Sequence, residues 1–231
     1  MNSNPKIAII TGGSAGIGKA CALAFAQADY CVCITGRNAA RLQRAADEIG
    51  AATGAEIDFR ATDVSDAQAC IELFEAISAQ SGQLDVLVNN AAFFEMGEAL
   101  EFPEESWQKM LATNVSGPFF CARAFAKKII EQKSAGCIVN ISSIAAKLSV
   151  PGYAAYSASK AALDNLTKSL ALEWAQNGIR VNGVAPGHTL TEGIRQAIDS
   201  GELDHKALEA ATPLGRLAEP AEVAELVLFL A

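Results

Sequence analysis

Short runs of β-branched and other apolar residues alternate along the chain with longer Ala- and Leu-rich segments of helical periodicity. Such alternation predicts parallel strands joined by crossover helices. The strands are expected at 6–11, 31–35, 56–62, 84–89, 137–142 and 180–185. The intervening helices are expected to begin near Ile17, Ala39, Ala67, Glu104, Pro118 and Ala154. The pattern therefore predicts an α/β fold, a doubly wound, Rossmann-like parallel sheet with helices on both faces.

No boundary divides this pattern into separate units. The sequence contains no internal repeat, low-complexity segment or Pro/Ser-rich linker, so residues 1–231 are expected to form a single domain. Doubly wound sheets bind ligands at the carboxyl ends of their strands, which makes the residues after each strand the candidate site.

Composition excludes several classes of protein. With 18 basic and 26 acidic residues the formal charge is −8, and no basic cluster extends beyond Lys127-Lys128, so a nucleic-acid surface is not expected. No apolar run reaches the length of a membrane span, and the N-terminal apolar run is too short for a signal peptide. The six cysteines form no C-x-x-C pair, which favours reduced core residues of a cytoplasmic protein without a metal site.

A glycine-rich segment, "TGGSAGIG" (11–18), follows the first strand and opens the first helix. It does not fit G-x-G-x-x-G, but it offers the same features: a tight turn, close backbone approach to a phosphate, and free N–H groups at a helix N-terminus. Nucleotide binding is one interpretation of this segment, and a plain connection between strand and helix is the other.

The end of the second strand bears on the choice between NAD and NADP. About twenty residues after the glycine loop, NAD-binding folds usually place an Asp or Glu near the ribose. Here Gly36 and Arg37 occupy that region, and no acid follows until Asp47. Arg37 favours NADP(H), because a guanidinium binds a 2′-phosphate well. The alternative is an exposed arginine at a helix start that Asn38 caps.

Polar residues also follow the third and fourth strands. Asp63 is placed where a carboxylate can accept a hydrogen bond from an adenine amino group, and Asn89 and Ala91 where small or polar residues can lie beside a ribose. Both positions have a structural alternative. Asp63 can instead belong to a turn before Asp66, the expected N-cap of the next helix.

Residues 156–160, "YSASK", place a phenol and an ammonium four residues apart on one face of an expected helix. Free tyrosine titrates at about 10 and is a poor proton carrier at neutral pH. A cation beside it favours the phenolate, so Lys160 is expected to lower the pKa of Tyr156. Ser143, at the carboxyl end of the fifth strand, is placed to hold a substrate oxygen, although serine pairs also form turns.

These motifs occur in an order that resembles the short-chain dehydrogenase/reductase family over almost the whole chain: the glycine loop, "NNAA", "ISS", "YSASK" and "PGHTLT". The resemblance implies hydride transfer between a nicotinamide and a carbonyl or secondary alcohol. It implies that the catalytic residues are Asn114, Ser143, Tyr156 and Lys160, with Asn114 joined to Lys160 through a water relay. The cofactor-binding residues that it implies are Gly12, Ser14, Ile17, Gly18, Arg37, Asp63, Val64, Asn89, Tyr156, Lys160, Pro186, Gly187 and Thr191.

Two features depart from the family pattern. "NNAA" at 89–92 replaces the usual N-N-A-G, which places an added methyl beside the cofactor. The family also usually continues past the helix at 220–231 into a final strand, so this C-terminal strand is expected to be absent and one sheet edge to be open or differently covered. A homodimer through the helices around Phe119 and Tyr156, or a homotetramer, is still expected.

The expected function is an NADP(H)-dependent oxidoreductase that acts on a small, largely apolar carbonyl compound or alcohol. The residues that would line its mouth are mostly apolar: Phe93, Phe94, Val150, Tyr153, His188 and the segment 190–214. One alternative is a non-catalytic NADP(H)-binding regulator or scaffold of the same fold. Another is non-redox elimination or epimerisation at Tyr156.

Overall fold

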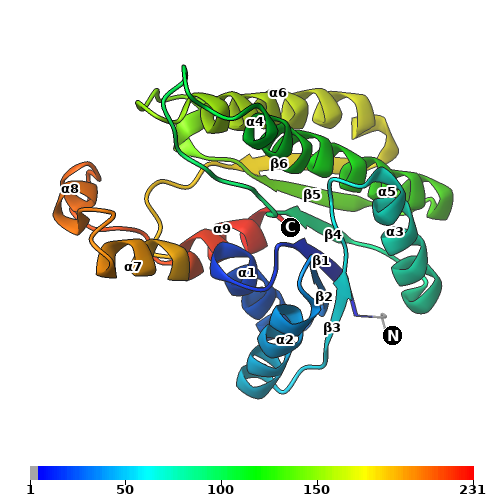
Figure 1. Cartoon of the computed structure of the whole chain (residues 1–231). Coiled ribbons are helices and arrows are strands. Elements are labelled where there is room, and N and C mark those ends of the chain that lie inside the picture. The colour runs from blue at the N-terminus through cyan, green and yellow to red at the C-terminus, as the bar shows by residue number, and fades with distance from the viewer. Residues whose placement is uncertain (1–4) are drawn as a thin grey trace.

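The computed structural model describes residues 5–231 and contains one six-stranded parallel sheet in the order β3-β2-β1-β4-β5-β6 (Figure 1). This order confirms the doubly wound, Rossmann-like fold. The expected strands all form, with ends that shift by at most two residues. They are β1 (Ile7–Thr11), β2 (Cys31–Gly36), β3 (Ile57–Ala61), β4 (Val86–Asn89), β5 (Gly136–Ile141) and β6 (Ile179–Val184).

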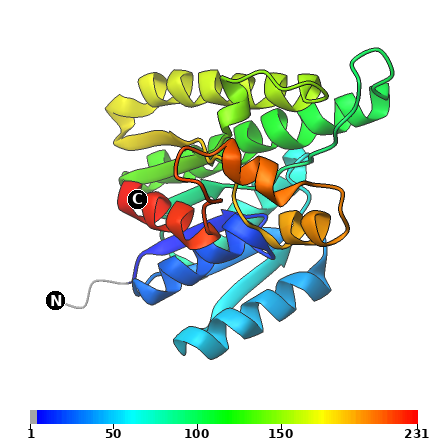
Figure 2. The ribbon, with the colours of Figure 1, turned by 90° about the vertical axis from the view of Figure 1, so that its left-hand side faces the viewer.

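The helices cover both faces of the sheet, as Figures 1 and 2 show. All six expected helix starts agree within one residue, and the helix expected at Pro118 begins at Gly117 after a π-helical turn at Ala112–Ser116. The helices are α1 (Gly16–Gln27), α2 (Ala39–Thr53), α3 (Ala67–Ser81), α4 (Glu104–Leu111), α5 (Gly117–Gln132), α6 (Ala154–Trp174), α7 (Glu192–Asp199), α8 (His205–Ala210) and α9 (Pro220–Leu230).

Each face of the sheet has its own apolar core. Side chains of α1, α2 and α9 pack on one face around Phe25, and side chains of α3, α5 and α6 pack on the other around Phe74 and Phe125. These three rings are fully buried, and each contributes roughly 1.5–3 kcal/mol relative to an exposed side chain. The sheet is therefore rigid, and its carboxyl edge is a stable platform for a site.

The strand order places a switch point between β1 and β4. The chain runs outward from β1 to β3, then returns and continues from β4 to β6. The connections after β1 and β4 therefore leave the sheet in opposite directions and open a crevice at the carboxyl edge. β6 lies at one edge of the sheet, and residues 5–231 contain no seventh strand.

Two expected helix caps are present. Asn38 accepts a hydrogen bond from the Arg41 backbone N–H at 3.0 Å, and Asp66 accepts from Gln68 and Ala69 at 2.8 and 3.1 Å. An N-cap of this kind stabilises a helix by about 1 kcal/mol. The cap at Asn38 does not leave Arg37 without a role, because Arg37 also faces the crevice described below.

All six cysteines are free thiols. Five are buried, but Cys31 is exposed, so the expectation that all six are core residues is wrong at this position. Cys31 is the first residue of β2, where the burial of the strand begins only with the following residue. Within residues 5–231, no helix is both long enough and apolar enough to cross a membrane.

Candidate active site

A cleft of about 740 Å³ lies at the carboxyl edge of the sheet, at the switch point between β1 and β4. Segments from the ends of β1, β2, β3 and β4 line it, together with the starts of α6 and α7. Among the expected site residues, those that line it are Gly12, Ser14, Ile17, Arg37, Asp63, Val64, Tyr156 and Thr191.

The glycine loop brings backbone close to this cleft. Gly12 has φ +66°, and a Cβ added there would lie 2.8 Å from the Asn90 side chain and 2.9 Å from the Ala91 backbone. A side chain at this position would therefore be strained by both its conformation and its surroundings. The N-cap of α1, Ala15, makes no side-chain hydrogen bond to the first turn, so backbone N–H groups there remain free to bind an anion.

Gly18 has a different role from the cleft-lining residues. It is buried in the first turn of α1, where an added Cβ would collide with the Gly12 carbonyl oxygen and the Asn90 side chain. The absence of a side chain lets the helix pack directly against the loop. Gly18 thus shapes the cleft from beneath and does not line it.

Two arginines lie at the outer end of the cleft. Arg37 follows β2, and Arg41 lies four residues later on the first turn of α2. Asp63 lines the same region, and its carboxylate accepts hydrogen bonds from the Ser65 backbone and hydroxyl at 3.0 and 2.7 Å. Burial opposes ionisation of Asp63, but these hydrogen bonds outweigh it and lower its pKa. The carboxylate thus stays charged and fixed in a turn.

Of the two asparagines at the end of β4, Asn90 lines the cleft and Asn89 does not. Asn89 is buried and donates to Asn140 at 2.9 Å and to the Pro118 carbonyl at 3.3 Å. Asn90 lines the cleft and donates to the carbonyls of Thr11 and Gly12 at 3.0 and 3.1 Å. Its amide therefore fixes the glycine loop against β4.

Tyr156, Ser143 and Lys160 meet at the inner end of the cleft. Ser143, two residues after β5, lies close enough to the Tyr156 phenol to lower the pKa of that phenol in part. The Lys160 ammonium lies 5.7 Å from the centre of the Tyr156 ring. It is almost completely buried and donates to the Ile141 carbonyl at 2.8 Å. The three groups expected from "ISS" and "YSASK" are thus brought together by the connection after β5 and by α6.

The expected pKa direction for Tyr156 is wrong in this structure. Burial raises the pKa of the Tyr156 phenol above its usual value, while the nearby Ser143 hydroxyl lowers this pKa only in part. Lys160 does not reverse this effect, because its ammonium is hydrogen-bonded to Ile141 below the ring. Burial also lowers the pKa of Lys160 from 10.5 to about 8. In the protein alone, Tyr156 is therefore a protonated phenol at neutral pH.

Asn114 lies on the π-helical turn and is fully buried. Its amide binds the backbone of Phe93 on both sides: it accepts from the N–H at 2.7 Å and donates to the carbonyl at 2.9 Å. It also donates to the Ser159 hydroxyl at 3.0 Å, which in turn donates to the Tyr156 carbonyl at 2.7 Å. Asn114 thus connects the loop after β4 to the helix that carries Tyr156 and Lys160.

The segment after β6 closes the cleft from the side. Thr191 lines the cleft and caps α7 through a 3.4 Å hydrogen bond from Ile194, and its side chain lies beside Gly16. Pro186 accepts from the Ile144 backbone at 3.0 Å, and Gly187 packs near the Ile144 side chain. These two residues therefore hold the loop next to Ser143 and do not line the cleft themselves.

The sequence model of the short chain dehydrogenase family matches residues 6–201. The chain belongs to the short-chain dehydrogenase/reductase family. The galactitol 2-dehydrogenase (L-tagatose-forming) of Cereibacter sphaeroides is 39% identical to this family member over 226 residues, which cover 97% of this chain and 87% of the relative. Since many similar proteins are named dehydrogenases or reductases, this short-chain dehydrogenase/reductase is an oxidoreductase.

Solved structures of similar proteins share the whole fold. ElxO with NADP bound has a TM-score of 0.93 and 37% identity, and the match covers 98% of this chain and 91% of ElxO. A variant of actinorhodin polyketide ketoreductase with NADPH has a TM-score of 0.91 and 33% identity, with 100% and 92% of the two chains covered. The family fold and the expected six-stranded sheet are both confirmed.

The residues of the cleft fit a dinucleotide of the size that these structures bind. Because Gly12 has no side chain, a pyrophosphate can come close to its backbone, and the free N–H groups of α1 can bind that pyrophosphate. Ala92, the departure from N-N-A-G, is exposed on the cleft wall, so its methyl group finds space there. Among residues 5–231, no group of three or more His, Cys, Asp or Glu side chains is arranged to hold a metal ion.

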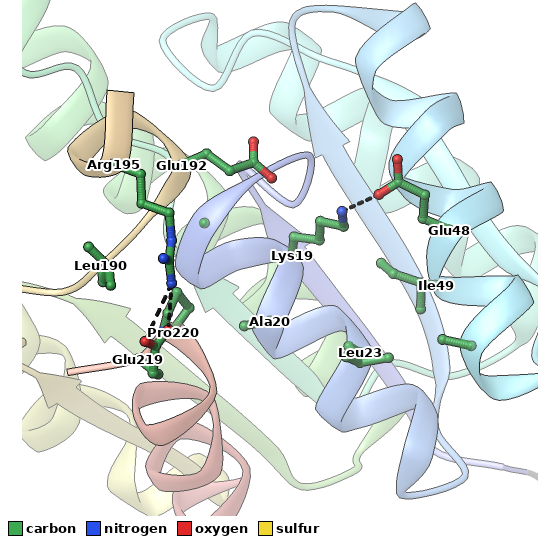
Figure 3. A pocket seen from close by; sticks show the side chains of 12 residues that line it. Lys19, Ala20, Leu23, Glu48, Ile49, Leu190, Glu192, Arg195, Glu219 and Pro220 are labelled. Atoms are coloured by element: carbon green, nitrogen blue, oxygen red, sulfur yellow. Dashed lines mark hydrogen bonds and ion pairs between the residues drawn. The ribbon is translucent and has the colours of Figure 1, made fainter. Parts of the chain in front are cut away.

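A second, smaller pocket of about 360 Å³ lies between α1, α2, α7 and the start of α9 (Figure 3). Lys19 pairs with Glu48 across α1 and α2, and Arg195 pairs with Glu219 at 3.2 Å between α7 and α9. Each cation of this pocket thus has a carboxylate partner. The second pair ties α7, which borders the nucleotide cleft, to the body of the fold.

Sequence reasoning missed several residues of the site. Arg41 could have been found from the sequence, because it lies in the first turn of the helix that was expected to begin at Ala39, just after Arg37. Asn90 was passed over for its neighbour Asn89, although side chains alternate along a strand and only one of the two can face the cleft. Ser159 had no signal, because its contact with Asn114 joins segments 45 residues apart.

Proposed function

We propose that this protein is an NADP(H)-dependent oxidoreductase that transfers a hydride between the nicotinamide and a carbonyl or secondary alcohol. Its substrate is a small, largely apolar molecule. The proposal is carried by one observation: Tyr156, with Ser143 and Lys160 close to it, lines the same cleft as two arginines. A single domain would thus hold both cofactor and reacting groups.

The residues at the inner end of the cleft suit reduction of a carbonyl compound to an alcohol. The nicotinamide, when bound, supplies or accepts the hydride. Tyr156 is a protonated phenol because burial raises its pKa, so it can donate a proton to the carbonyl oxygen. Ser143 is placed to hold that oxygen, and the Lys160 ammonium lies close enough to stabilise the phenolate that forms. Asn114 acts by holding the helix and the loop in place, and a water relay from it to Lys160 is part of the proposal.

The preference for NADP(H) over NAD(H) is inferred from the residues at the outer end of the cleft. Arg37 and Arg41 provide two guanidinium groups where a 2′-phosphate would lie, and the acid in that region, Asp63, is engaged with Ser65. A carboxylate that accepts from a ribose 2′-hydroxyl, as in NAD-binding folds, is not placed there. NADP(H) is therefore preferred over NAD(H), with Asp63 and Val64 beside the adenine and Asn89 bracing the ribose side from below.

The alternative functions receive less support. A non-catalytic NADP(H)-binding regulator has no need for a buried lysine beside a phenol, since burying an ammonium is costly. Elimination or epimerisation at Tyr156 has no need for two arginines at the far end of the cleft. The regulator would bind NADPH without oxidising it. An elimination or epimerisation enzyme would not oxidise NADPH either, whether or not it binds it.

A homodimer or homotetramer in the cytoplasm remains a prediction from the family resemblance. Ile130 on α5 and Leu172 on α6 expose large apolar side chains, which are surfaces that a second copy would cover. Light scattering coupled to size-exclusion chromatography measures the number of copies directly.

Titration of NADPH and NADH by tryptophan fluorescence, followed by a screen of ketones and diketones, tests the proposed function. We expect tighter binding of NADPH and NADPH oxidation with at least one ketone, abolished in Tyr156→Phe. Binding of NADPH without turnover of any carbonyl compound would support the regulator instead. Equal affinity for both cofactors would remove the role given to Arg37 and Arg41.

A further inference from the structure

Three aromatic rings gather where the nucleotide cleft ends. Phe94, from the loop after β4, meets the Tyr156 ring edge to face, with ring centres 4.9 Å apart. Tyr153, just before α6, lies 5.3 Å from Phe94 and 6.2 Å from Tyr156. We call Phe94, Tyr153 and Tyr156 the aromatic cluster. Since Tyr156 also lines the cleft, the other two rings stand immediately beyond the reacting position.

The loop that carries Phe94 is held at three points. Asn114 binds the backbone of Phe93, the Glu95 carboxylate accepts from the Ser106 hydroxyl at 2.9 Å, and the Gly97 N–H donates to the Gly152 carbonyl at 3.1 Å. The last of these bonds joins the loop to the turn that precedes Tyr153. Phe94 is therefore a positioned ring and not a mobile surface residue.

Despite this support, Phe94 is 47% exposed, so much of its ring has no partner. Met96 on the same loop and Val150, three residues before Tyr153, are exposed apolar side chains as well. Glu95, the polar residue next to Phe94, is engaged with Ser106, and Asn114, which holds the loop, is engaged with Phe93 and Ser159. A substrate with many hydroxyl groups would find few free partners here, whereas a flat apolar group would cover the exposed ring.

We propose that Phe94 and Tyr153 hold a planar ring of the substrate, so that the preferred carbonyl substrates carry an aryl or conjugated ring next to the reacting carbon. This inference rests on the function proposed above and narrows its substrate class. In the reduction, the carbonyl π bond breaks, the carbon gains the hydride of NADPH, and the oxygen gains the Tyr156 proton. The products are a secondary alcohol with the ring attached and NADP⁺.

A pair of ketones of similar size tests this assignment: acetophenone, which has a planar ring, and cyclohexyl methyl ketone, whose ring is saturated and puckered. We expect kcat/KM for acetophenone to be higher by about two- to tenfold, the range that an added aromatic pair supplies. In Phe94→Leu and in Tyr153→Leu the ratio of kcat/KM for acetophenone to that for cyclohexyl methyl ketone should fall toward one. Tyr153→Phe keeps the ring and should keep the preference. Phe229→Leu, at an exposed ring on α9, is the matched control.

Binding gives a second readout that needs no turnover. Calorimetric titration of both ketones into the Tyr156→Phe protein loaded with NADP⁺ should show the same preference for acetophenone, and added Phe94→Leu should remove it. Equal binding and equal turnover of the two ketones, or a preference that survives both leucine variants, would overturn this inference alone. If acetophenone binds preferentially but no ketone is reduced by the wild type, the proposed reaction fails and the ring-binding role stands.

Discussion

Replacing the buried Lys160 should change how the stability of the protein depends on pH. The ammonium is 3% exposed, and burial lowers its pKa from 10.5 to about 8. Below about pH 8 the lysine is charged in both folded and unfolded protein, and the fold bears the full cost of burying the charge. That cost corresponds to about 3 kcal/mol for a shift of this size.

The sign follows from the protons bound in each state. Between about pH 8 and the usual value of 10.5, the unfolded chain binds more protons at Lys160 than the folded protein, so the free energy of unfolding rises with pH. In Lys160→Met this contribution is absent. The wild type should therefore gain about 2.5 kcal/mol relative to the variant from about pH 7 to about pH 10.

Urea unfolding of both proteins at several pH values, followed by circular dichroism, measures this difference. The methionine leaves the Ile141 carbonyl without its 2.8 Å donor, but that cost is the same at every pH. Lys168→Met, at an exposed position on the same helix, is the control and should show a flat difference from the wild type. A flat or falling difference for Lys160→Met would refute the assignment of a desolvated ammonium beneath Tyr156.

Further predictions concern the cofactor, the proton and the loop. Arg37→Asp should invert the preference for NADPH over NADH measured by fluorescence titration, and an unchanged preference would reassign the 2′-phosphate contact. Gly12→Ala should weaken NADPH binding by about tenfold or more, because a Cβ at φ +66° meets Asn90 and Ala91. Because burial raises the pKa of Tyr156, alcohol oxidation should accelerate as pH rises through the alkaline range, while carbonyl reduction should not. Steady-state rates measured in both directions test this, and a reduction rate that rises with pH while the oxidation rate does not would contradict it. Asn114→Ala frees the backbone of Phe93, so it should lower kcat/KM while leaving the NADPH dissociation constant unchanged.

The alternation of apolar strands and helices was sufficient to predict the sheet, because its central strands β1, β4 and β5 are buried along their whole length and are mostly apolar in sequence. The strand-to-helix turn at the glycine loop and the shared helical face of Tyr156 and Lys160 were also predictable, since both are local patterns whose geometry a strand end or a helix imposes. Arg41 could have been predicted for the same reason.

What the sequence could not supply depends on contacts between distant segments. The pKa direction of Tyr156 is set by how deeply the phenol is buried, and helical spacing to Lys160 gives no information on burial. Gly18 packs against the Gly12 carbonyl and the Asn90 side chain, a contact between segments that the glycine pattern alone does not show. The aromatic cluster brings together residues from 94 and from 153–156, and no periodicity connects those two segments.

Transfer of deuterium tests the proposed reaction most directly. The wild-type protein is incubated with NADPH that carries deuterium at the transferable C4 position and with a ketone that it reduces, and the alcohol is analysed by mass spectrometry. We expect one deuterium on the carbinol carbon, and no labelled alcohol above background with Tyr156→Phe despite unchanged binding of NADPH. Labelled alcohol formed at the same rate by Tyr156→Phe, or alcohol without deuterium, would contradict hydride transfer with Tyr156 as the proton donor.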